Sequence, residues 1–206
     1  ESRGLGDVYK RQEKGFFPKE ELTTFRAIGS RLQGHPDMNK APGIDFSAGS
    51  LGQGVSAACG MALAGKLGHK DYRVYTILGD GEIEEGQVWE AAMFADHYKL
   101  DNLCFIIDNN DLQIDGRVGE VSSPYPIDEK FRAFGFEVFC CDGHDFAALE
   151  ETFQKVLKVT GKPAAIIAKT VKGKGVSYME DQVGWHGKAP NDAEYEQGMK
   201  ELEEVR

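Results

Sequence analysis

The chain has 206 residues and a formal net charge of −10, because 34 Asp and Glu outnumber 24 Lys and Arg. This length can bury a sizeable apolar core, and the acidic balance argues against a nucleic-acid partner. No apolar stretch is long enough to span a membrane and no signal peptide is evident, so we expect a cytoplasmic protein without membrane contact.

The predicted elements alternate between helices and strands. In chain order, we predict a helix over 18–32, a helix over 55–67, a strand over 73–78, a helix over 87–99, strands over 103–107 and 136–141, a helix capped by Asp145, a strand over 164–168 and an acidic helix after Pro190. The strands are apolar, which is typical of buried parallel strands. Helices between parallel strands make right-handed crossovers. We therefore predict an α/β fold with a doubly wound, mostly parallel sheet and helices on both faces.

Two of these helices have a clear apolar face at helical spacing. In the first helix this face consists of Leu22, Phe25, Ile28 and Leu32. In the helix after Asp145 it consists of Phe146, Leu149, Phe153, Val156 and Leu157. We expect both faces to point inward.

The four cysteines do not form a recognisable disulfide framework. Cys59 and Cys104 lie inside apolar segments, and Cys140 and Cys141 are adjacent. We interpret all four as small buried residues in a reducing compartment. A weaker alternative is a zinc site formed by Cys140, Cys141 and His144.

Polar loops follow two of the predicted strands. The first strand ends at Gly79-Asp80-Gly81 and the second is followed by Asn109-Asn110. If these strands are neighbours, Asp80 and Asn110 share one edge of the sheet and can bind one Mg²⁺ or Ca²⁺, with a diphosphate as the natural further ligand. The glycines allow backbone amides to approach an anion. The alternative is that both loops are simple turns that favour Asp and Asn.

These loops also resemble a known family. Gly79-Asp80-Gly81 followed by Asn109-Asn110 resembles the thiamine diphosphate signature. Four further segments resemble transketolase: Gly-His-Pro at 34–36, Ser-Ala-Gly-Ser-Leu-Gly-Gln-Gly at 47–54, Leu-Gln-Ile-Asp-Gly at 112–116 and Gly-Trp-His-Gly at 184–187. The nearest likeness is to the N-terminal subunit of the split bacterial enzyme, over residues 13–206.

The resemblance implies a thiamine diphosphate-binding fold and a transketolase reaction. In that reaction a two-carbon ketol unit moves from a ketose phosphate, such as xylulose 5-phosphate in the pentose phosphate pathway, to an aldose phosphate. The cofactor carries the difficult step. The implied cofactors are thiamine diphosphate and Mg²⁺, or Ca²⁺ in its place.

The resemblance also assigns the residues around the metal and the diphosphate. The carboxylate of Asp80, the side chain of Asn110 and the backbone carbonyl of Leu112 are the implied metal ligands. Gly81 is expected to offer its amide to the diphosphate, with Gly79 on the other side of Asp80.

Further residues are implied for the thiamine rings. Leu51, in a turn with Gly49 and Ser50, is expected to pack on the aminopyrimidine. Ile114 is expected to press on the thiazolium. Together they would hold the bent conformer that brings the amino group to the reactive carbon.

Three residues are implied to act in catalysis: His35, His186 and Glu85. The two histidines fall where the family has substrate-side and diphosphate-side imidazoles, which can donate or move a proton near neutral pH. His186 is thereby also a cofactor-binding residue. Glu85 matches a glutamate that couples paired sites. Without the resemblance, a structural role is the ordinary interpretation of His35, and the lysines over 169–174 are interpreted as solvated.

The chain departs from the complete enzyme in two ways. It has no room for a pyrimidine-binding domain, so we expect a separate C-terminal transketolase subunit to supply it, in a dimer of such pairs. Residues 1–12 do not match the family, and two family histidine segments are absent. We interpret 1–12 as truncation or junction sequence and 13–206 as one thiamine diphosphate domain lacking its N-terminal part. This chain is then expected to be inactive by itself.

Other functions share single features with this sequence. Deoxyxylulose-phosphate synthase and a 2-oxo acid dehydrogenase subunit share the Gly-Asp-Gly feature. A P-loop over 60–66 lacks the Ser or Thr that binds Mg²⁺, and a dinucleotide site at 79–84 lacks its third glycine. The His-Pro-Asp tripeptide at 35–37 is found in J-type cochaperones, but no basic helix precedes it.

Overall fold

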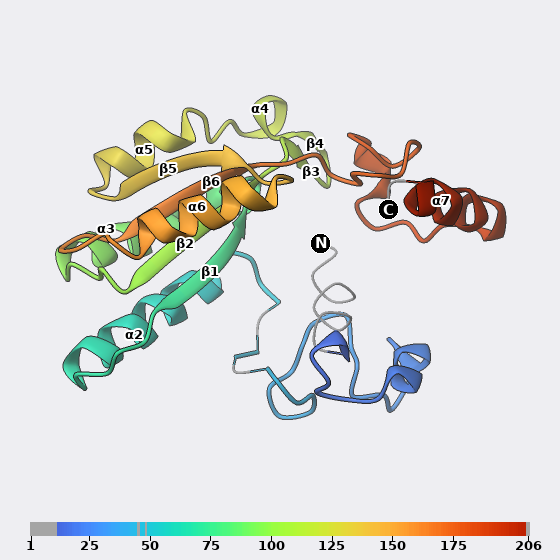
Figure 1. Ribbon diagram of the computed structural model, residues 1–206, viewed down its shortest axis with the longest axis horizontal. Helices are drawn as coiled ribbons and strands as arrows, with labels where there is room; N and C mark the ends of the chain where they lie inside the picture. Colours follow the sequence, from blue (N-terminus) through green and yellow to red (C-terminus); the bar gives the residue numbers. More distant parts are fainter. Residues whose placement is uncertain (1–11, 45, 48, 205–206) are drawn as a thin grey trace. The chain divides into compact units, whose positions relative to one another are not determined.

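The computed structural model describes residues 12–44, 46–47 and 49–204. By their internal contacts, residues 1–54 and 55–206 form two compact units (Figure 1). Each unit is described by itself. The expectation for residues 1–12 lies, apart from Gln12, outside the described residues.

The larger unit contains a four-stranded sheet with the order β1-β2-β6-β5. All three strand pairs are parallel. The strands are β1 (Val74–Gly79), β2 (Leu103–Asn109), β5 (Glu137–Asp142) and β6 (Ala164–Lys169). Each lies within two residues of a predicted strand. The prediction of a parallel α/β fold is therefore confirmed.

Helices cover both faces of this sheet (Figure 1). The helices α2 (Gln53–Leu67), α3 (Gly86–His97) and α5 (Ile127–Ala133) share one apolar core with the first face. The helix α6 (Phe146–Val156) packs on the other face through Val156 and Phe153. As predicted, Asp145 caps α6: its Oδ1 accepts hydrogen bonds from the amides of Ala147 (2.8 Å) and Ala148 (3.2 Å). Such a cap stabilises a helix by about 1 kcal/mol.

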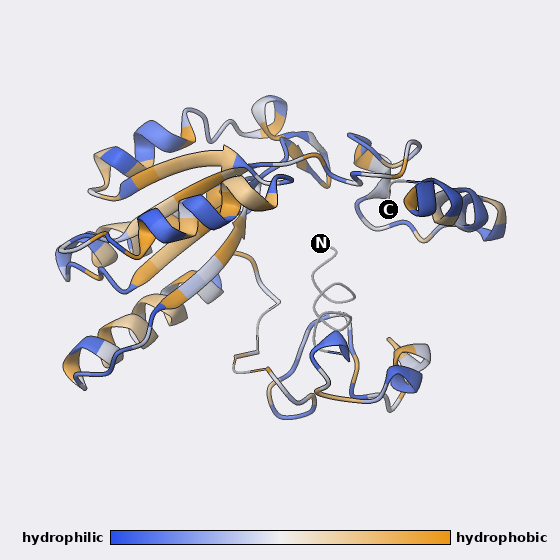
Figure 2. Ribbon diagram, in the orientation of Figure 1, coloured by the Kyte–Doolittle hydropathy of each residue, from blue (hydrophilic) through white to orange (hydrophobic). Residues whose placement is uncertain are grey.

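The edge strand β1 differs from the buried strand that was predicted. Its outer-face side chains Tyr75 and Ile77 are 43% and 59% exposed, whereas Leu78 is buried. Phe153 of α6 reaches only the ring of Tyr75, with centroids 5.9 Å apart. Figure 2 shows the strands as predominantly hydrophobic, and for β1 part of that surface is not covered by α6.

The predicted helix over 18–32 is wrong. The smaller unit instead has a 3₁₀ helix, η1 (Lys19–Thr24), which ends where Arg26 and Gly29 adopt φ angles of 61° and 81°. Ile28, which the helical spacing turned inward, is fully exposed. The apolar residues pack instead around a small cluster of Phe17, Leu32, Ala41 and Ile44.

Several short elements were not predicted, because two to seven residues are too few to show a period. They are η2 (Glu82–Glu84), β3 (Leu112–Gln113) paired antiparallel with β4 (Gly116–Arg117), α4 (Val118–Val121), α5 and η3 (Val183–Trp185). The acidic helix after Pro190 is confirmed as α7 (Asp192–Glu204). In the described part of the chain, no helix combines the length and apolar character needed to cross a membrane.

Two further expectations are corrected. At the ends of α6, Phe146 is 88% exposed and Leu157 is 45% exposed, so neither points inward. All four cysteines are free, but only Cys59 and Cys104 are buried, whereas Cys140 is exposed. Side chains alternate along a strand, so Cys140 and Cys141 of β5 face opposite sides of the sheet.

Candidate functional site

Asp80 is a buried carboxylate at the carboxyl end of β1. It is 1% exposed. Its Oδ1 accepts a hydrogen bond from the amide of Gly81 (3.0 Å). Its Oδ2 accepts from Asn109 Nδ2 (2.9 Å) and from the amide of Asp111 (2.5 Å). Three donors therefore fix the orientation of this carboxylate.

The electrostatic setting of Asp80 favours a cation. Burial raises the pKa of Asp80 above its usual value, and the negative charge of Asp108 acts in the same direction. The hydrogen bonds from Asn109, Asp111 and Gly81 oppose this shift but do not cancel it. A divalent cation beside Asp80 would offset the cost of burying the charge.

The structure brings Asp80 and Asn110 to the same edge of the sheet. Because β1 and β2 are parallel neighbours with Gly79 opposite Asp108, the loops that follow them lie side by side. Asn110 is buried, and its Oδ1 accepts a hydrogen bond from the amide of Leu112 (3.0 Å). A carboxylate, a side-chain amide oxygen and a backbone carbonyl are the hard oxygen donors that suit Mg²⁺ or Ca²⁺.

The glycines beside Asp80 have different roles. A Cβ on Gly81 would lie 3.0 Å from Cβ of Gln113, so the loop needs glycine there, whereas a Cβ on Gly79 would make only ordinary contacts. The amide of Gly79 donates to Oε2 of Glu82 (3.0 Å), and that of Gly81 donates to Asp80. Both amides thus already have carboxylate acceptors, contrary to the expectation that they stand open to an anion.

Acidic side chains surround the start of α3. Burial raises the pKa of Glu84, which accepts a hydrogen bond from Gln113 Nε2 (2.8 Å). Glu85 is the N-cap of α3 but caps none of its amides with its side chain, which is exposed. Glu85 is therefore free of a structural capping role.

Ile114 lies between the short strands β3 and β4 and is 68% exposed. An isoleucine with this exposure contributes little to the core, so its apolar surface is available to a ligand. It follows closely on Asn110 and Leu112.

His186 directly follows η3 and is partly buried. Burial lowers its pKa, and the positive charge of Lys172 acts in the same direction. The neutral imidazole is therefore favoured near neutral pH. Lys172 was interpreted as a solvated lysine, and its proximity to His186 was not predicted.

The remaining predicted residues belong to the smaller unit. There His35 packs closely against Gly49, since a Cβ on Gly49 would lie 3.3 Å from the imidazole ring. Ser47 Oγ donates to Asp37 Oδ1 (3.3 Å) and accepts from the amide of Met38 (2.9 Å). The Gly-His-Pro turn and the turn with Ser50 and Leu51 are thus held together within this unit.

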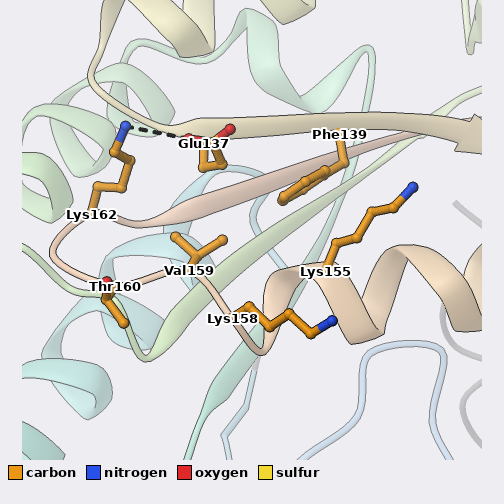
Figure 3. A pocket seen from close by; sticks show the side chains of 7 residues that line it. All are labelled: Glu137, Phe139, Lys155, Lys158, Val159, Thr160 and Lys162. Atoms are coloured by element: carbon orange, nitrogen blue, oxygen red, sulfur yellow. Dashed lines mark hydrogen bonds and ion pairs between the residues drawn. The ribbon is translucent and has the colours of Figure 1, made fainter.

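Two hollows lie elsewhere on the larger unit. One of about 810 Å³ is beside the site at the carboxyl ends of β2, β6 and β5, and Asn109 and Tyr125 form part of its wall. The other, of about 350 Å³, is near the start of β5, with lysines around Phe139 (Figure 3). Ligands in open parallel sheets bind at the carboxyl edge, so the hollow in Figure 3 is not the candidate active site.

The structure does not support two alternatives. Among the described residues no group of three or more His, Cys, Asp or Glu is arranged to hold a metal, and His144 Nε2 accepts the amide of Val171 (2.7 Å). This counts against zinc at Cys140, Cys141 and His144. Residues 60–66 lie within α2, so they do not form a phosphate-binding loop.

Comparison with known proteins supports the resemblance. Residues 14–203 match the family model described as the thiamine diphosphate-binding domain of transketolase. The chain belongs to the transketolase family. It is 43% identical to a 6-deoxy-6-sulfo-D-fructose transketolase subunit of Clostridium sp. (strain MSTE9), covering 92% of this chain and 69% of the relative.

Other members show how much of a transketolase this chain represents. One of the two subunits of an apulose-4-phosphate transketolase from Actinobacillus succinogenes is 40% identical, with 93% of this chain and 69% of the relative covered. Mouse transketolase is 46% identical over 85% of this chain, but only 28% of its own length is matched. The crystal structure of Campylobacter jejuni transketolase superposes with a TM-score of 0.84 at 33% identity, covering 89% of this chain and 30% of that chain.

Proposed function

We propose that this chain is the thiamine diphosphate-binding subunit of a split transketolase. It would transfer a two-carbon ketol unit from a ketose phosphate to an aldose phosphate, together with a separate subunit that carries the pyrimidine-binding domain. The observation that carries the proposal is the oriented, buried carboxylate of Asp80 beside Asn110 and Leu112. The two relatives named as subunits, each matched over 69% of its length, support the separate partner.

In this proposal, Asp80, the Asn110 side chain and the Leu112 carbonyl hold Mg²⁺, or Ca²⁺ in its place. Bound thiamine diphosphate supplies the chemistry that breaks and remakes a carbon–carbon bond next to a carbonyl. The chain's own contribution is to neutralise and orient the diphosphate. Gly81 would serve it with its amide, with Gly79 beside the metal loop.

Other residues would position the rings and move protons. Ile114 and the turn Gly49-Ser50-Leu51 would contact the thiazolium and the aminopyrimidine. The neutral imidazole of His186 would donate to the diphosphate or to a substrate hydroxyl, and His35 would act on the substrate side. Glu85, exposed at the start of α3, would couple paired sites in a dimer of such subunit pairs.

The compartment is also part of the proposal. The four cysteines are free and two of them are not buried, which supports a reducing compartment such as the cytoplasm. The sugar phosphates of the pentose phosphate pathway are the proposed substrates, although two relatives are named for apulose 4-phosphate and for a sulfofructose.

Calorimetric titration tests the cofactor and the partner together. Thiamine diphosphate with Mg²⁺ should bind weakly or not at all to this chain alone, and with micromolar or tighter affinity once the C-terminal subunit is added. The reason is that the aminopyrimidine would remain in water without the second subunit. An Asp80→Ala, Asn110→Ala double variant that still binds tightly in the complex would contradict the assignment.

A donor assay tests the reaction. The reconstituted complex should release an aldose phosphate from a ketose phosphate and extend an aldose acceptor by two carbons. Pyruvate should not serve as donor. Release of carbon dioxide from pyruvate would instead favour a deoxyxylulose-phosphate synthase or a 2-oxo acid dehydrogenase.

A further inference from the structure

The turn between Asn110 and Leu112 has an unfavourable backbone conformation. Asp111 has a φ of 65°, which non-glycine residues rarely adopt. In this conformation its amide donates to Asp80 Oδ2 at 2.5 Å. The conformation therefore directs an amide at the carboxylate and sets the backbone of its two neighbours, Asn110 and Leu112.

Both oxygens of the Asp111 side chain are held in place. Oδ1 accepts a hydrogen bond from Tyr125 Oη (3.1 Å), and Oδ2 accepts from Arg117 Nη1 (2.9 Å). An occupied carboxylate that is paired with Arg117 is a poor competitor for a cation meant for Asp80. The same contacts resist relaxation of the backbone at Asp111.

The hydrogen bonds around Asp80 form a closed ring. Asn109 Nδ2 donates to Asp80 Oδ2 and also to Tyr125 Oη, both at 2.9 Å. Tyr125 Oη donates to the Asp111 side chain, and the Asp111 amide returns to Asp80. Asn109 is 6% exposed, so this part of the ring is shielded from competing water.

Arg117 extends the ring to the segment that carries Lys172 and His186. Its Nη2 donates to Asp181 Oδ2 at 2.5 Å. The amide of Asp181 in turn donates to the carbonyl of Lys172 at 3.0 Å. The guanidinium is thus shared between the metal loop and the His186 segment.

From these contacts we infer that Tyr125, Asp111 and Arg117 are positioning residues for the metal site. None of them supplies a metal ligand. Tyr125 and Asp111 fix the Asp80 carboxylate and the Asn110–Leu112 turn relative to each other, and Arg117 aligns the His186 segment with that turn. The inference rests on the proposed function, because it assumes a cation at Asp80.

Metal affinity tests the inference directly. Mn²⁺ is titrated into the complex of the full chain with its partner subunit in the presence of saturating thiamine diphosphate, and free Mn²⁺ is measured by electron paramagnetic resonance. Tyr125→Phe and Arg117→Gln should each weaken Mn²⁺ binding about 10-fold or more, as loss of ligand-orienting partners does. Combined, they should weaken it by less than the product of the single effects, since both act on the Asp111 carboxylate.

Matched controls come from the same unit. Tyr72→Phe removes a hydroxyl that donates to the Met61 carbonyl (2.8 Å), and Arg132→Gln removes a guanidinium paired with Asp128 (2.5 Å). Both should bind Mn²⁺ as the unaltered chain does. If either Tyr125→Phe or Arg117→Gln folds and binds Mn²⁺ within about twofold of the controls, the inference is wrong.

A second variant covers the case in which Tyr125→Phe does not fold. Asp111→Gly allows the same backbone angle but removes the anchored side chain. It should retain its unfolding temperature and still lose Mn²⁺ affinity; unchanged affinity would overturn the inference. Asp80→Asn separates the two proposals: if it too leaves Mn²⁺ binding intact, the cation site itself is misassigned.

Discussion

Asp80→Asn should abolish binding of thiamine diphosphate with Mg²⁺ to the reconstituted complex, and with it the transfer of ketol units. The substitution keeps the shape of the side chain but removes its charge. A unit charge about 4 Å from a cation contributes on the order of 4 kcal/mol per unit of cation charge at an effective dielectric constant of about 20. Calorimetry should therefore find an affinity reduced by roughly a thousandfold.

The same substitution should affect stability in the opposite direction. Because the folded-state pKa of Asp80 is raised, the folded chain binds protons more tightly there than the unfolded chain, and its stability falls as pH rises from the unfolded pKa through the raised one. Asparagine does not titrate. Without cofactor, Asp80→Asn should thus equal or exceed the unaltered chain in stability near neutral pH, and its advantage should shrink in acid.

Urea unfolding at several pH values measures this effect. Asn110→Asp is the matched control, since it adds a carboxylate next to Asp80 and should lower stability most at neutral pH. A variant Asp80→Asn that is several kcal/mol less stable than the unaltered chain would assign Asp80 a mainly structural role.

The second large effect is expected at Phe105. Phe105→Ala should lower the free energy of unfolding by about 3–5 kcal/mol, the usual range for a fully buried phenylalanine. Phe105 lies in β2 with no exposed surface, and its ring contacts Phe136 and Phe131 at centroid distances of 5.0 and 6.1 Å. Since small domains are stable by only about 5–15 kcal/mol, this loss would reduce the folded population at elevated temperature.

Phe146→Ala is the control for this change. The same atoms are removed, but Phe146 is 88% exposed at the first turn of α6. Its unfolding free energy should stay within about 0.5 kcal/mol of the unaltered chain. Equal losses for the two variants would show that burial in the aromatic cluster is not the source of the effect.

The four strands were predictable because each is a short apolar run that stops at a polar or glycine-containing loop. That pattern also placed Asp80 and Asn110 at one edge, since parallel neighbours end together. The helix over 18–32 failed because spacing alone does not register that Arg26 and Gly29 leave the helical region. The exposed Phe146 and Leu157 show the same limit at helix ends.

The partners of Asp80 could not be predicted. Tyr125 and Arg117 reach Asp111 from separate short elements, and nothing in their spacing signals a shared carboxylate. Asn109 was visible only as the neighbour of Asn110. Hydrogen-bond rings of this kind depend on how loops fold back, which a sequence period does not encode.

The position of β1 at the end of the strand order has a practical consequence. One row of its backbone amides and carbonyls has no neighbouring strand within the four-stranded sheet, and Ile77 beside it is 59% exposed. An open strand border with apolar side chains is a template for intermolecular pairing. Preparations of this chain by itself should therefore form aggregates rich in β-structure on storage, and lysine substituted at Ile77 should keep them clear.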